Sequence, residues 1–510
     1  MTAQNQFRPH PGWHDFHATF AAQQSQIVTL QLANDLITPL GAYMQCAKAH
    51  DYAFILESVE GGQHLGRYSV VGMAPDLIWR CDRGTAYITH IDDSLSELAD
   101  GQQSLPALES LKQVHAASLI DSVPDYLPPM AASGLFGNLG YDMVREIEAI
   151  PDNNPDTLGL PDATMIRPGR MIVFDNSKHI ITLAVPVYHH AGNSRQDAET
   201  VYNRAVEVLQ NMADQLNHAS SKQIAQVPSK SSVERAMAQI QVQANMDRAT
   251  YKQIVEECRA YIYAGDVFQV LPSLRFQFEP ACSGLDMYRA LRRINPSPFM
   301  FYLKFDDFEL LGASPEILVR VRDNQVTLRP LAGTRPRGAD AEDDAKLARE
   351  LLADPKERAE HLMLLDLGRN DVGRVAKTGS VAVDEQFGVE YYSHVMHIVS
   401  HVTGTLDTEC YTPLEALFAG FPAGTLTGAP KIRAMEIIDE LEPERRSFYG
   451  GCIGYFDGTG NIDSCIALRT ALIKDGICYG QAGGGVVADS DPDTEYEEAC
   501  NKHRAILHAA

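Results

Sequence analysis

The chain has 510 residues, of which 45% are hydrophobic and 22% are charged, a composition typical of a soluble globular protein with two domains or one large core. Its formal net charge of −24 argues against nucleic acid or an anionic membrane as a partner, since both are bound by an excess of Lys and Arg. Nine cysteines without close pairs predict free thiols in a reducing compartment, and because neither a signal peptide nor an apolar run of about 18 residues is found, we predict a cytoplasmic protein without a membrane span.

The N-terminal part begins with short predicted strands separated by glycine turns. An apolar run from Ala53 leads into Glu57, Ser58 and a Gly-Gly turn, and residues 67–72 form a second strand. A carboxylate and a hydroxyl at this point could bind the ammonium or carboxylate group of a small ligand. A serine that only satisfies turn backbone groups is the more common explanation.

A polar stretch divides the chain. Residues 195–217 have helical periodicity, whereas residues 218–234 are rich in Ser, Lys and Gln and short of large apolar side chains, as is typical of a linker. We therefore predict an N-terminal domain over residues 1–217, a linker over residues 218–245 and a second domain over residues 246–510.

The second domain begins with a predicted helix followed by strands. The helix spans residues 247–264, and Gly265 closes it. Residues 266–276 form a predicted strand in which Pro272 implies an edge or a bulge. Further on, Glu316 stands among apolar neighbours, where a carboxyl group tends to keep its proton, as a general acid must. A buried ion pair would explain the same residue equally well.

Two predicted helices carry glutamates three residues apart. Glu357 and Glu360 lie among strong helix formers, and Glu495 and Glu498 lie in a helix that opens at Pro492. Because residues i and i+3 share one helical face, two such helices facing each other could hold one hard divalent cation. For either pair alone, a solvated helix face is the more common explanation.

Glycine-rich and small-residue loops could bind an anion. Residues 483–485 are three glycines, whose unshielded backbone N–H groups allow an anion to approach the main chain, and Lys502 lies one turn beyond the second glutamate pair. A loop over residues 421–430 feeds a helix with Pro430 predicted in its first turn, and such helix N-termini attract anions.

Other residues allow a site or a purely structural role. Gly333 and Thr334 at a strand end could bind a carboxylate or form a plain turn. Arg469 interrupts an alternating strand, where its guanidinium could bind a carboxylate at a site or could form a structural salt bridge. His397 lies between His394 and His401 in a β-branched, alternating segment. This pattern predicts a strand, which separates His394 from the other two and disfavours a histidine-bound metal, but is compatible with one active-site histidine.

Many segments of the chain occur in an order characteristic of one family. They are ILESVEGGQHLGRYSVVG, GDVFQV, NPSPFMFYLKF, GASPEILVR, RPLAGTRPRG, DPKERAEHLMLLDLGRNDVGRV, SHVMHIVSHVTG, FPAGTLTGAPKIRAMEIIDELEP, YGGCIGYF, DSCIALRTA and QAGGGVVADSDPDTEYEEACNK. From about residue 53 to the end, and continuously from residue 250, the chain resembles the chorismate-utilising enzymes, most closely the large subunits (component I) of anthranilate synthases. The resemblance implies an α+β fold of two interleaved domains with large antiparallel sheets and flanking helices.

The resemblance also implies the site. Mg²⁺ would be held by Glu360 and Glu498, with Glu357 and Glu495 acting through water, and would grip the ring carboxylate of chorismate. The implied catalytic residues are Glu316 as the acid for the departing hydroxyl, His397 in a role that the resemblance does not define, and Thr425. The implied substrate-binding residues are Gly333, Thr334, Tyr449, Arg469, Gly483, Gly484, Gly485 and Lys502.

The reaction implied by the resemblance converts chorismate and ammonia to anthranilate and pyruvate, the first step of tryptophan biosynthesis. Relatives that form a covalent intermediate carry a lysine where this chain has Ala332, and relatives that activate water carry a lysine where it has Gln269, so ammonia is the expected nucleophile. The family obtains ammonia from a glutamine amidotransferase subunit (component II), so a hetero-oligomer is implied. An aminodeoxychorismate synthase is the nearest alternative, and a catalytically silent tryptophan sensor is an alternative of another class.

Two segments resemble the tryptophan pocket through which the family is inhibited by its end product. The implied contacts are Ser58, Pro298, Phe299 and Met300, with Glu57 shaping the wall. Phe299 stands where relatives have tyrosine, and Gly484 stands where they have alanine. The first difference removes a hydroxyl from the pocket, whereas the second retains the backbone donor.

Overall fold

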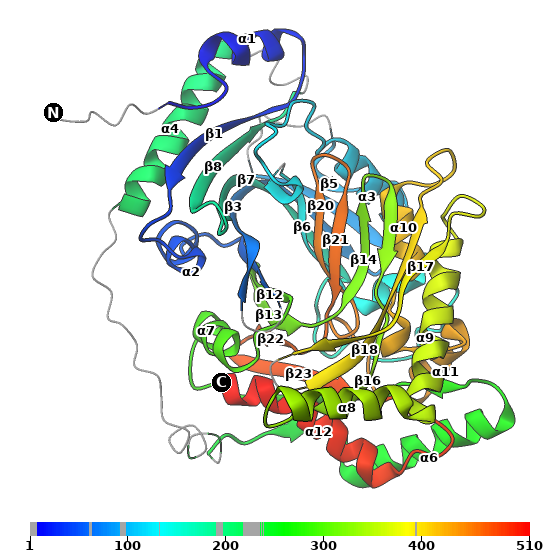
Figure 1. Ribbon diagram of the computed structural model, residues 1–510. Coiled ribbons are helices and arrows are strands. Elements are labelled where there is room, and N and C mark those ends of the chain that lie inside the picture. Colours follow the sequence, from blue (N-terminus) through cyan, green and yellow to red (C-terminus); the bar gives the residue numbers. More distant parts are fainter. Residues whose placement is uncertain are drawn as a thin grey trace.

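The computed structural model describes residues 8–60, 64–91, 98–131, 133–189, 197–217, 235, 237, 239–392 and 395–510. Two large antiparallel sheets form its centre, with helices on their outer faces (Figure 1). The α+β fold expected from the resemblance is therefore confirmed. Residues 218–234 of the predicted linker and His394 lie outside the described residues, and the predicted domain limits stay a prediction.

The first sheet combines strands from both halves of the chain. Strand β2 is the strand predicted from Ala53. It pairs on one side with β3 and on the other with β12, which lies beyond the predicted linker. In order of pairing, the strands are β1 (Gln26–Ala33), β8 (Ile180–Val187), β7 (Ala163–Asp175), β3 (His64–Asp82), β2 (Ala53–Glu60), β12 (Phe299–Lys304), β13 (Phe308–Ser314), β22 (Thr470–Lys474), β23 (Ile477–Gly483), β11 (Ser273–Phe278) and β9 (Gln243–Ala244).

The second sheet shares β3 and β7 with the first. The later residues of β3 pair with β4, and the earlier residues of β7 pair with β6, so both long strands pass from one sheet into the other. In order of pairing, the sheet comprises β5 (Gly101–Gln102), β4 (Thr85–His90), β3, β7, β6 (Gly134–Leu139), β20 (Cys452–Asp457), β21 (Ile462–Ile466), β14 (Ile317–Arg322), β15 (Gln325–Leu328) and β18 (Val395–Thr405), with β16 (Leu331–Pro336) and β17 (Ala382–Tyr391) also on β18.

Aromatic side chains from both halves fill the space between the sheets. Phe54 of β2 stacks on Phe136 of β6 with ring centroids 4.6 Å apart, and Phe136 stacks on Tyr455 of β20 at 5.5 Å. A Cβ on Gly72 would lie 2.2 Å from the Phe54 ring, so only glycine allows β3 to approach. Each such buried ring contributes roughly 1.5–3 kcal/mol to folding, which makes the two halves one cooperative core.

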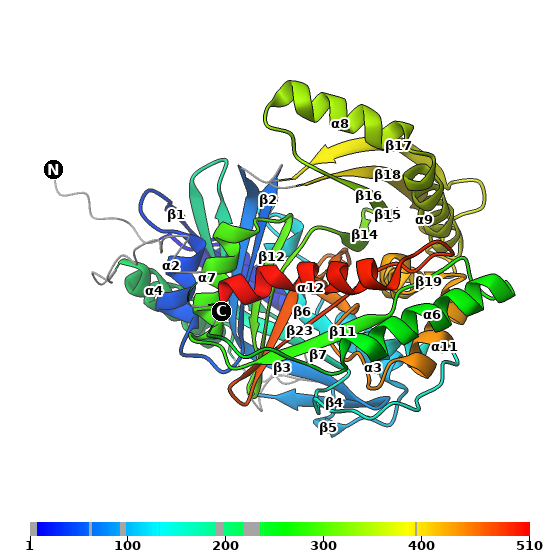
Figure 2. The same ribbon diagram turned by 90° about the horizontal axis from the view of Figure 1, so that it is seen from below.

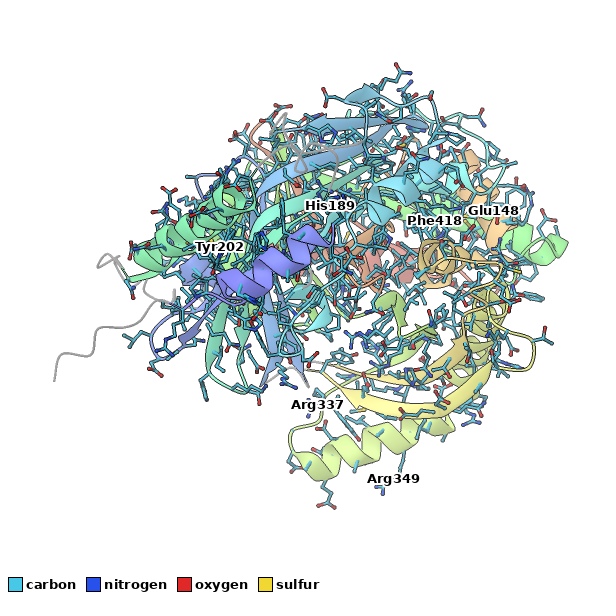
Figure 3. The ribbon with its side chains drawn as sticks, turned by 90° about the horizontal axis from the view of Figure 1, so that it is seen from above. Glu148, His189, Tyr202, Arg337, Arg349 and Phe418 are labelled. Atoms are coloured by element: carbon cyan, nitrogen blue, oxygen red, sulfur yellow. The ribbon has the colours of Figure 1, made fainter. Side chains whose placement is uncertain are left out.

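Helices cover the outer faces. Figure 2, seen from below, shows α12 crossing the molecule with α6 beside it and α8 at the edge next to β17. Seen from above, Tyr202 of α4 and Arg349 of α8 lie far apart (Figure 3). The two helices pack on different ends of the connected sheets, α4 on β8 and α8 on β16. The helices are α1 (Trp13–Ala21), α2 (Pro39–Ala42), α3 (Ala107–Ala116), α4 (Ala198–Asn217), α6 (Arg248–Ala264), α7 (Gly284–Ile294), α8 (Ala341–Ala353), α9 (Pro355–Gly373), α10 (Pro413–Gly420), α11 (Lys431–Leu441) and α12 (Pro492–Ala509).

Most local expectations are confirmed. Helix α6 is capped by Asp247 and ends at Gly265, whose φ of 86° is left-handed. Pro272 interrupts the predicted strand, which separates into β10 (Gln269–Val270), paired with β19 (Gly428–Ala429), and β11. The predicted histidine strand is β18. One expectation is wrong by a residue, because Pro430 is extended and precedes α11 instead of lying in its first turn.

The cysteines and the helices can be compared with the predictions made from composition. All nine cysteines are free thiols, as predicted. Within the described residues, no helix combines the length and the apolar character that crossing a membrane requires.

A candidate active-site cavity between α9 and α12

The predicted site residues come together around one cavity of about 780 Å³. Helices α9 and α12 form two of its walls, and the others come from β16, β18, the end of β23 and the loops before α11 and β22. All predicted catalytic, substrate and metal residues line it except Gly484, whose neighbours Gly483 and Gly485 both do. The lining includes Glu316, Gly333, Thr334, Glu357, Glu360, His397, Thr425, Tyr449, Arg469, Gly483, Gly485, Glu495, Glu498 and Lys502.

Local sequence explains why both glutamate pairs lie on the cavity side of their helices. The Asp354 side chain caps α9 and Asp491 caps α12, and each helix has proline in its first turn, which fixes where it starts. On α9, the buried His361 donates or accepts a 2.7 Å hydrogen bond with Ser400 of β18. This contact sets the rotation of α9 against the sheet and leaves Glu360 directed to the cavity.

The inner glutamates, Glu360 and Glu495, are the ones that resist ionisation. Burial raises the pKa of Glu360, and the carboxylates of Glu357 and Glu498 raise it further, while Gln269 donates a 3.1 Å hydrogen bond to it. Burial, with the charge of Glu498, likewise raises the pKa of Glu495. Crowded carboxylates of this kind are stabilised by a cation placed among them.

The outer glutamates are neutralised by basic side chains. Glu357 accepts a 2.9 Å ion-paired hydrogen bond from Arg335, which also binds Asp354 at 2.7 Å. Glu498 pairs with Lys502 at 2.7 Å, and the same ammonium donates to the carbonyl of Gly483 at 2.9 Å.

A hard divalent cation fits this donor set. Four carboxylates from two helices surround the cavity, and the buried Glu495 Oε2 has no hydrogen-bond partner, which is the kind of atom that a metal ion would satisfy. In the described part of the chain, no three His, Cys, Asp or Glu side chains are already gathered around one point. The metal ligands named from the sequence thus remain predictions, and occupancy would require the outer glutamates to turn inward.

The glycines of the 483–485 loop are required by close contacts. A Cβ on Gly483 would lie 2.2 Å from the Pro272 carbonyl oxygen, one on Gly485 would lie 2.5 Å from Gln269 Nε2, and one on Gly484 would lie 2.5 Å from Glu495 Oε2. The loop therefore lies against Glu495 and Glu498 of α12 and against Gln269 of β10. Its backbone can form the floor of the cavity only because no side chain intervenes.

Glu316 has the properties of a general acid. It is 8% exposed, and burial raises its pKa to about 8, although a hydrogen bond from Thr425 opposes the shift. The Thr425 hydroxyl donates to Oε1 at 3.0 Å, which leaves Oε2 to carry the proton. Among the described residues no cation pairs with Glu316, so the alternative of a buried ion pair is not the one observed.

His397 is held as a neutral imidazole. Burial lowers its pKa to about 4, and the charges of Arg469 and Lys502 act in the same direction. Its Nδ1 lies 3.0 Å from the Gly333 carbonyl oxygen, and since a carbonyl only accepts, Nδ1 carries the hydrogen. Thr334 pairs with His397, and the register shift between Ala332 and Thr334 leaves Gly333, with φ of 75°, as the bulged residue beside this pair. Nε2 then carries the lone pair.

Arg469 and Tyr449 form another part of the cavity wall. Burial lowers the pKa of Arg469, while Tyr449 and Glu498 act to raise it, and burial raises the pKa of Tyr449 to about 12. Tyr449 therefore keeps its proton at neutral pH, a guanidinium stays protonated in proteins, and both groups can donate hydrogen bonds. A guanidinium enclosed at a cavity wall is well suited to an anionic group such as a carboxylate.

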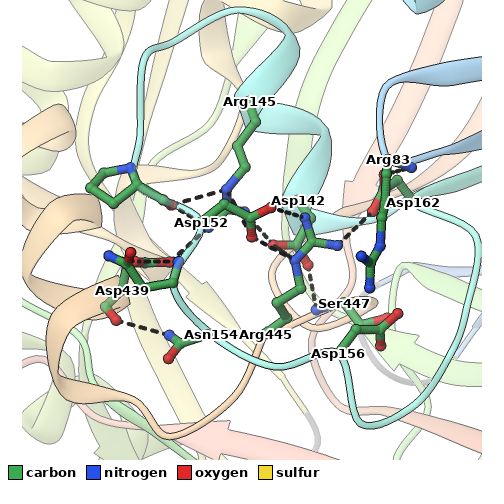
Figure 4. A network of polar contacts seen from close by, with 12 residues as sticks. Arg83, Asp142, Arg145, Asp152, Asn154, Asp156, Asp162, Asp439, Arg445 and Ser447 are labelled. Carbon is green, nitrogen blue, oxygen red and sulfur yellow. Dashed lines mark hydrogen bonds and ion pairs between the residues drawn. The ribbon is translucent and has the colours of Figure 1, made fainter.

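A polar network holds this wall from behind. The buried Arg446 binds Glu442 at 2.7 Å and the Leu426 carbonyl at 2.6 Å, with its guanidinium 5.6 Å from the Tyr449 ring centroid. Figure 4 shows the adjoining contacts, in which Arg445 binds Asp152 at 2.8 and 2.9 Å. The N-terminal half thus fixes a segment of the cavity wall.

The segments predicted to bind tryptophan are neighbours in the first sheet. Met300 pairs with Glu57, and Ser58 falls at the register shift between Glu57 and Val59. Phe299 begins β12, and Pro298 precedes it. Glu57 is buried, however, and already binds Tyr288 and Arg292 of α7 at 2.7 Å each, so it acts here by holding α7 on the sheet.

Sequence reasoning missed several residues of the cavity. The sequence marks Gln269 only as the replacement of a lysine, yet its amide contacts Glu360 and the Gly485 backbone region. Arg335 joins the Gly-Thr motif to both Asp354 and Glu357. The sequence signal that could have identified Arg335 is its position, two residues after Gly333 and within a basic loop. The sequence around His361 does not indicate its role, because its hydrogen-bond partner Ser400 lies on a distant strand.

Comparisons with known proteins give one consistent result. Residues 74–508 match the family model described as chorismate binding enzyme. The chain is 49% identical over 506 residues to anthranilate synthase component 1 of Cereibacter sphaeroides, covering 98% of this chain and 97% of that protein. It is 44% identical over 483 residues to the protein of the same name from Pseudomonas aeruginosa, covering 93% of each.

Solved structures agree. The crystal structure of anthranilate synthase component I from Streptococcus pneumoniae matches with a TM-score of 0.72 at 33% identity, over 93% of this chain and 99% of that one. The menaquinone-specific isochorismate synthase from Escherichia coli matches with a TM-score of 0.67 at 18% identity, over 97% and 98% of the two chains. The second match bears on the fold alone.

Proposed function

Because this chain belongs to the chorismate-binding enzyme family, we propose that it is a lyase that converts chorismate and ammonia to anthranilate and pyruvate. The observation that carries the proposal is the cavity between α9 and α12, where an acid, a neutral imidazole, four carboxylates and an enclosed arginine meet. Similarity to anthranilate synthase component 1 over nearly the whole chain supports the choice of reaction.

Binding of the substrate's two carboxylates has to overcome the acidity of this protein. Arg469, Lys502 and the backbone of the 483–485 loop are the groups that would hold one carboxylate. Glu360 and Glu498, with Glu357 and Glu495, would hold Mg²⁺, which when bound would supply positive charge for the ring carboxylate. Gly333 and Thr334 line the same cavity and would fix the orientation of the ring.

In the first step, ammonia adds to the ring and the hydroxyl leaves as water. Glu316 is protonated at neutral pH because its pKa is about 8, so its Oε2 can give the proton that the departing oxygen needs. Thr425 keeps the carboxyl group in this orientation through its bond to Oε1.

In the second step, a ring proton leaves, the enolpyruvyl ether bond breaks, and the methylene carbon gains a proton, so that pyruvate and an aromatic ring result. A neutral His397, with Nδ1 bound to the Gly333 carbonyl, has a basic Nε2 at the cavity wall. It is the group we assign to accept the ring proton.

The nucleophile distinguishes this reaction from those of relatives. Activation of water or covalent attack would require a basic amine at the positions of Gln269 or Ala332, and neither residue provides one. We therefore propose ammonia, delivered by a glutamine amidotransferase subunit, in a cytoplasmic hetero-oligomer that begins tryptophan biosynthesis. The name "component 1" of the relatives supports a partner subunit.

A product assay tests the proposal. Purified protein with chorismate, ammonium and Mg²⁺ is expected to release anthranilate, measured by its fluorescence, and an equal amount of pyruvate, measured with lactate dehydrogenase. Water in place of ammonium should give neither product. An amino-substituted product without pyruvate would favour an aminodeoxychorismate synthase, and tryptophan binding without any turnover would favour a sensor.

Substitution of Ser58 by Leu is expected to abolish inhibition by tryptophan while leaving turnover intact. Ser58 lies at the strand irregularity beside the residues that pair with β12, and a larger side chain there would occupy the proposed pocket. The concentration of tryptophan that halves activity should rise by about 30-fold, the equivalent of about 2 kcal/mol of lost binding.

A matched control is Ser177→Leu, at an exposed turn between β7 and β8. It should leave inhibition unchanged. Retained inhibition in the Ser58 variant, with an unchanged melting temperature, would remove this strand pair from the tryptophan site.

A further inference from the structure

The ion pair between Glu498 and Lys502 joins two residues to which the proposed function gives different ligands. Glu498 would bind the divalent cation and Lys502 would bind an anionic group of the substrate. In the structure they bind each other at 2.7 Å, one helical turn apart on α12. Neither residue can therefore serve its own ligand fully while the pair is closed.

We propose that Lys502 exchanges partners, so that its ammonium passes from Glu498 to a carboxylate of the substrate when Glu498 turns to the divalent cation. This inference rests on the proposed function and adds to it a mechanism by which the two ligands bind cooperatively. Binding of either ligand weakens the pair and so favours binding of the other, as linkage requires.

The pair is one that can be exchanged at small cost. The side chains of Lys502 and Glu498 are 36% and 44% exposed, and exposed ion pairs of this spacing contribute little to stability. Each partner faces the cavity, so neither has to cross a packed core to change its contact.

The alternative partners of Lys502 make the exchange specific. Its other contact is the carbonyl of Gly483, which lies in the proposed anion-binding loop. Departure of Glu498 would leave the ammonium at this loop without an ion-pair partner among the contacts of the described residues. The Arg335–Glu357 pair offers a contrast, because Arg335 also binds Asp354 and would remain neutralised if Glu357 turned away.

The exchange predicts an unusual effect in the absence of metal. In the metal-free protein, Glu498 competes with the substrate for Lys502. Replacing Glu498 by Gln removes the competitor, so metal-free affinity for chorismate should increase, by about fivefold. The same change with Lys502 already replaced by Met should alter affinity by less than about twofold, since no ammonium remains to be released.

The experiment is a double-mutant cycle read out by calorimetric titration of chorismate in EDTA, without ammonium. It uses the full chain as the parent, Glu498→Gln, Lys502→Met and the double variant. The control is Glu497→Gln, which removes a carboxylate of the same helix that also lines the cavity but pairs with Arg248 instead of Lys502. Its effect, which reports only general repulsion of an anion, should be equal in the parent and in the Lys502→Met variant.

The outcomes separate the inference from the function on which it rests. An equal gain from Glu498→Gln in both backgrounds would show that only net charge matters and would overturn the exchange. So would a metal-free affinity that Glu498→Gln leaves unchanged. Failure of the parent to bind chorismate even with Mg²⁺ would instead reject the proposed function, and the exchange with it. Unfolding curves for each variant identify any that does not fold.

Discussion

Glu360→Gln is expected to lower turnover of chorismate by about 1,000-fold or more at millimolar Mg²⁺. Glu360 is the inner carboxylate of α9, where burial and two neighbouring glutamates raise its pKa and Gln269 holds one oxygen. Glutamine keeps the shape and the hydrogen-bonding capacity but removes the charge that a divalent cation requires. The affinity for Mn²⁺, used as a paramagnetic substitute and measured by electron paramagnetic resonance, should fall in parallel.

The matched control for this change is Asp366→Asn on the same helix. Asp366 is exposed and pairs only with Arg369, one turn away, among the contacts of the described residues. Its loss should change turnover by less than about twofold. Full Mg²⁺-dependent activity in the Glu360 variant would remove the metal assignment, whatever happens to the other glutamates.

Glu316→Gln is expected to lower turnover by about 100- to 10,000-fold, the usual contribution of a general acid. Because the acid acts in its protonated form and its pKa is about 8, activity of the parent should fall as the pH rises through about 8. The Thr425 hydrogen bond lowers this pKa, so Thr425→Val should move the alkaline limb to higher pH. The measurement is the pH dependence of kcat across a range from about 6 to about 10, chosen around that pKa.

Thr425→Ser serves as the control, because it retains the hydroxyl and should leave the alkaline limb in place. If the alkaline limb of kcat stays at the same pH in a folded Thr425→Val variant, a group other than Glu316 is responsible for that limb. Glu316 would then have only a structural role, despite its position in the cavity wall.

Local patterns predicted much of the secondary structure, because the signals lie within a few residues. Asp247 and Gly265 mark the two ends of α6, and β-branched alternation identified β18 in spite of a histidine spacing that suggests a helix. The pattern could not show that β2 inserts between β3 and β12. That pairing joins segments far apart in the chain, and no local periodicity records such a contact.

The residues of the candidate site were predicted through the resemblance. The contacts and geometry of these residues were not predicted. The spacing of Glu357 and Glu360 gave a shared helical face but not the basic partners of the outer glutamates, which come from β16 and from α12 itself. The tautomer of His397 depends on the bulge that turns the Gly333 carbonyl toward it, whereas burial keeps the ring neutral. Such contacts arise only when distant segments pack.

Pairing between strands from the two halves of the chain has a consequence for how the gene can be divided. A break after residue 217 would separate β2 from β12 and β6 from β20, and both fragments would expose long unpaired strand edges, which are prone to aggregation. Insertions or fusions are therefore tolerated only outside the strand ladders.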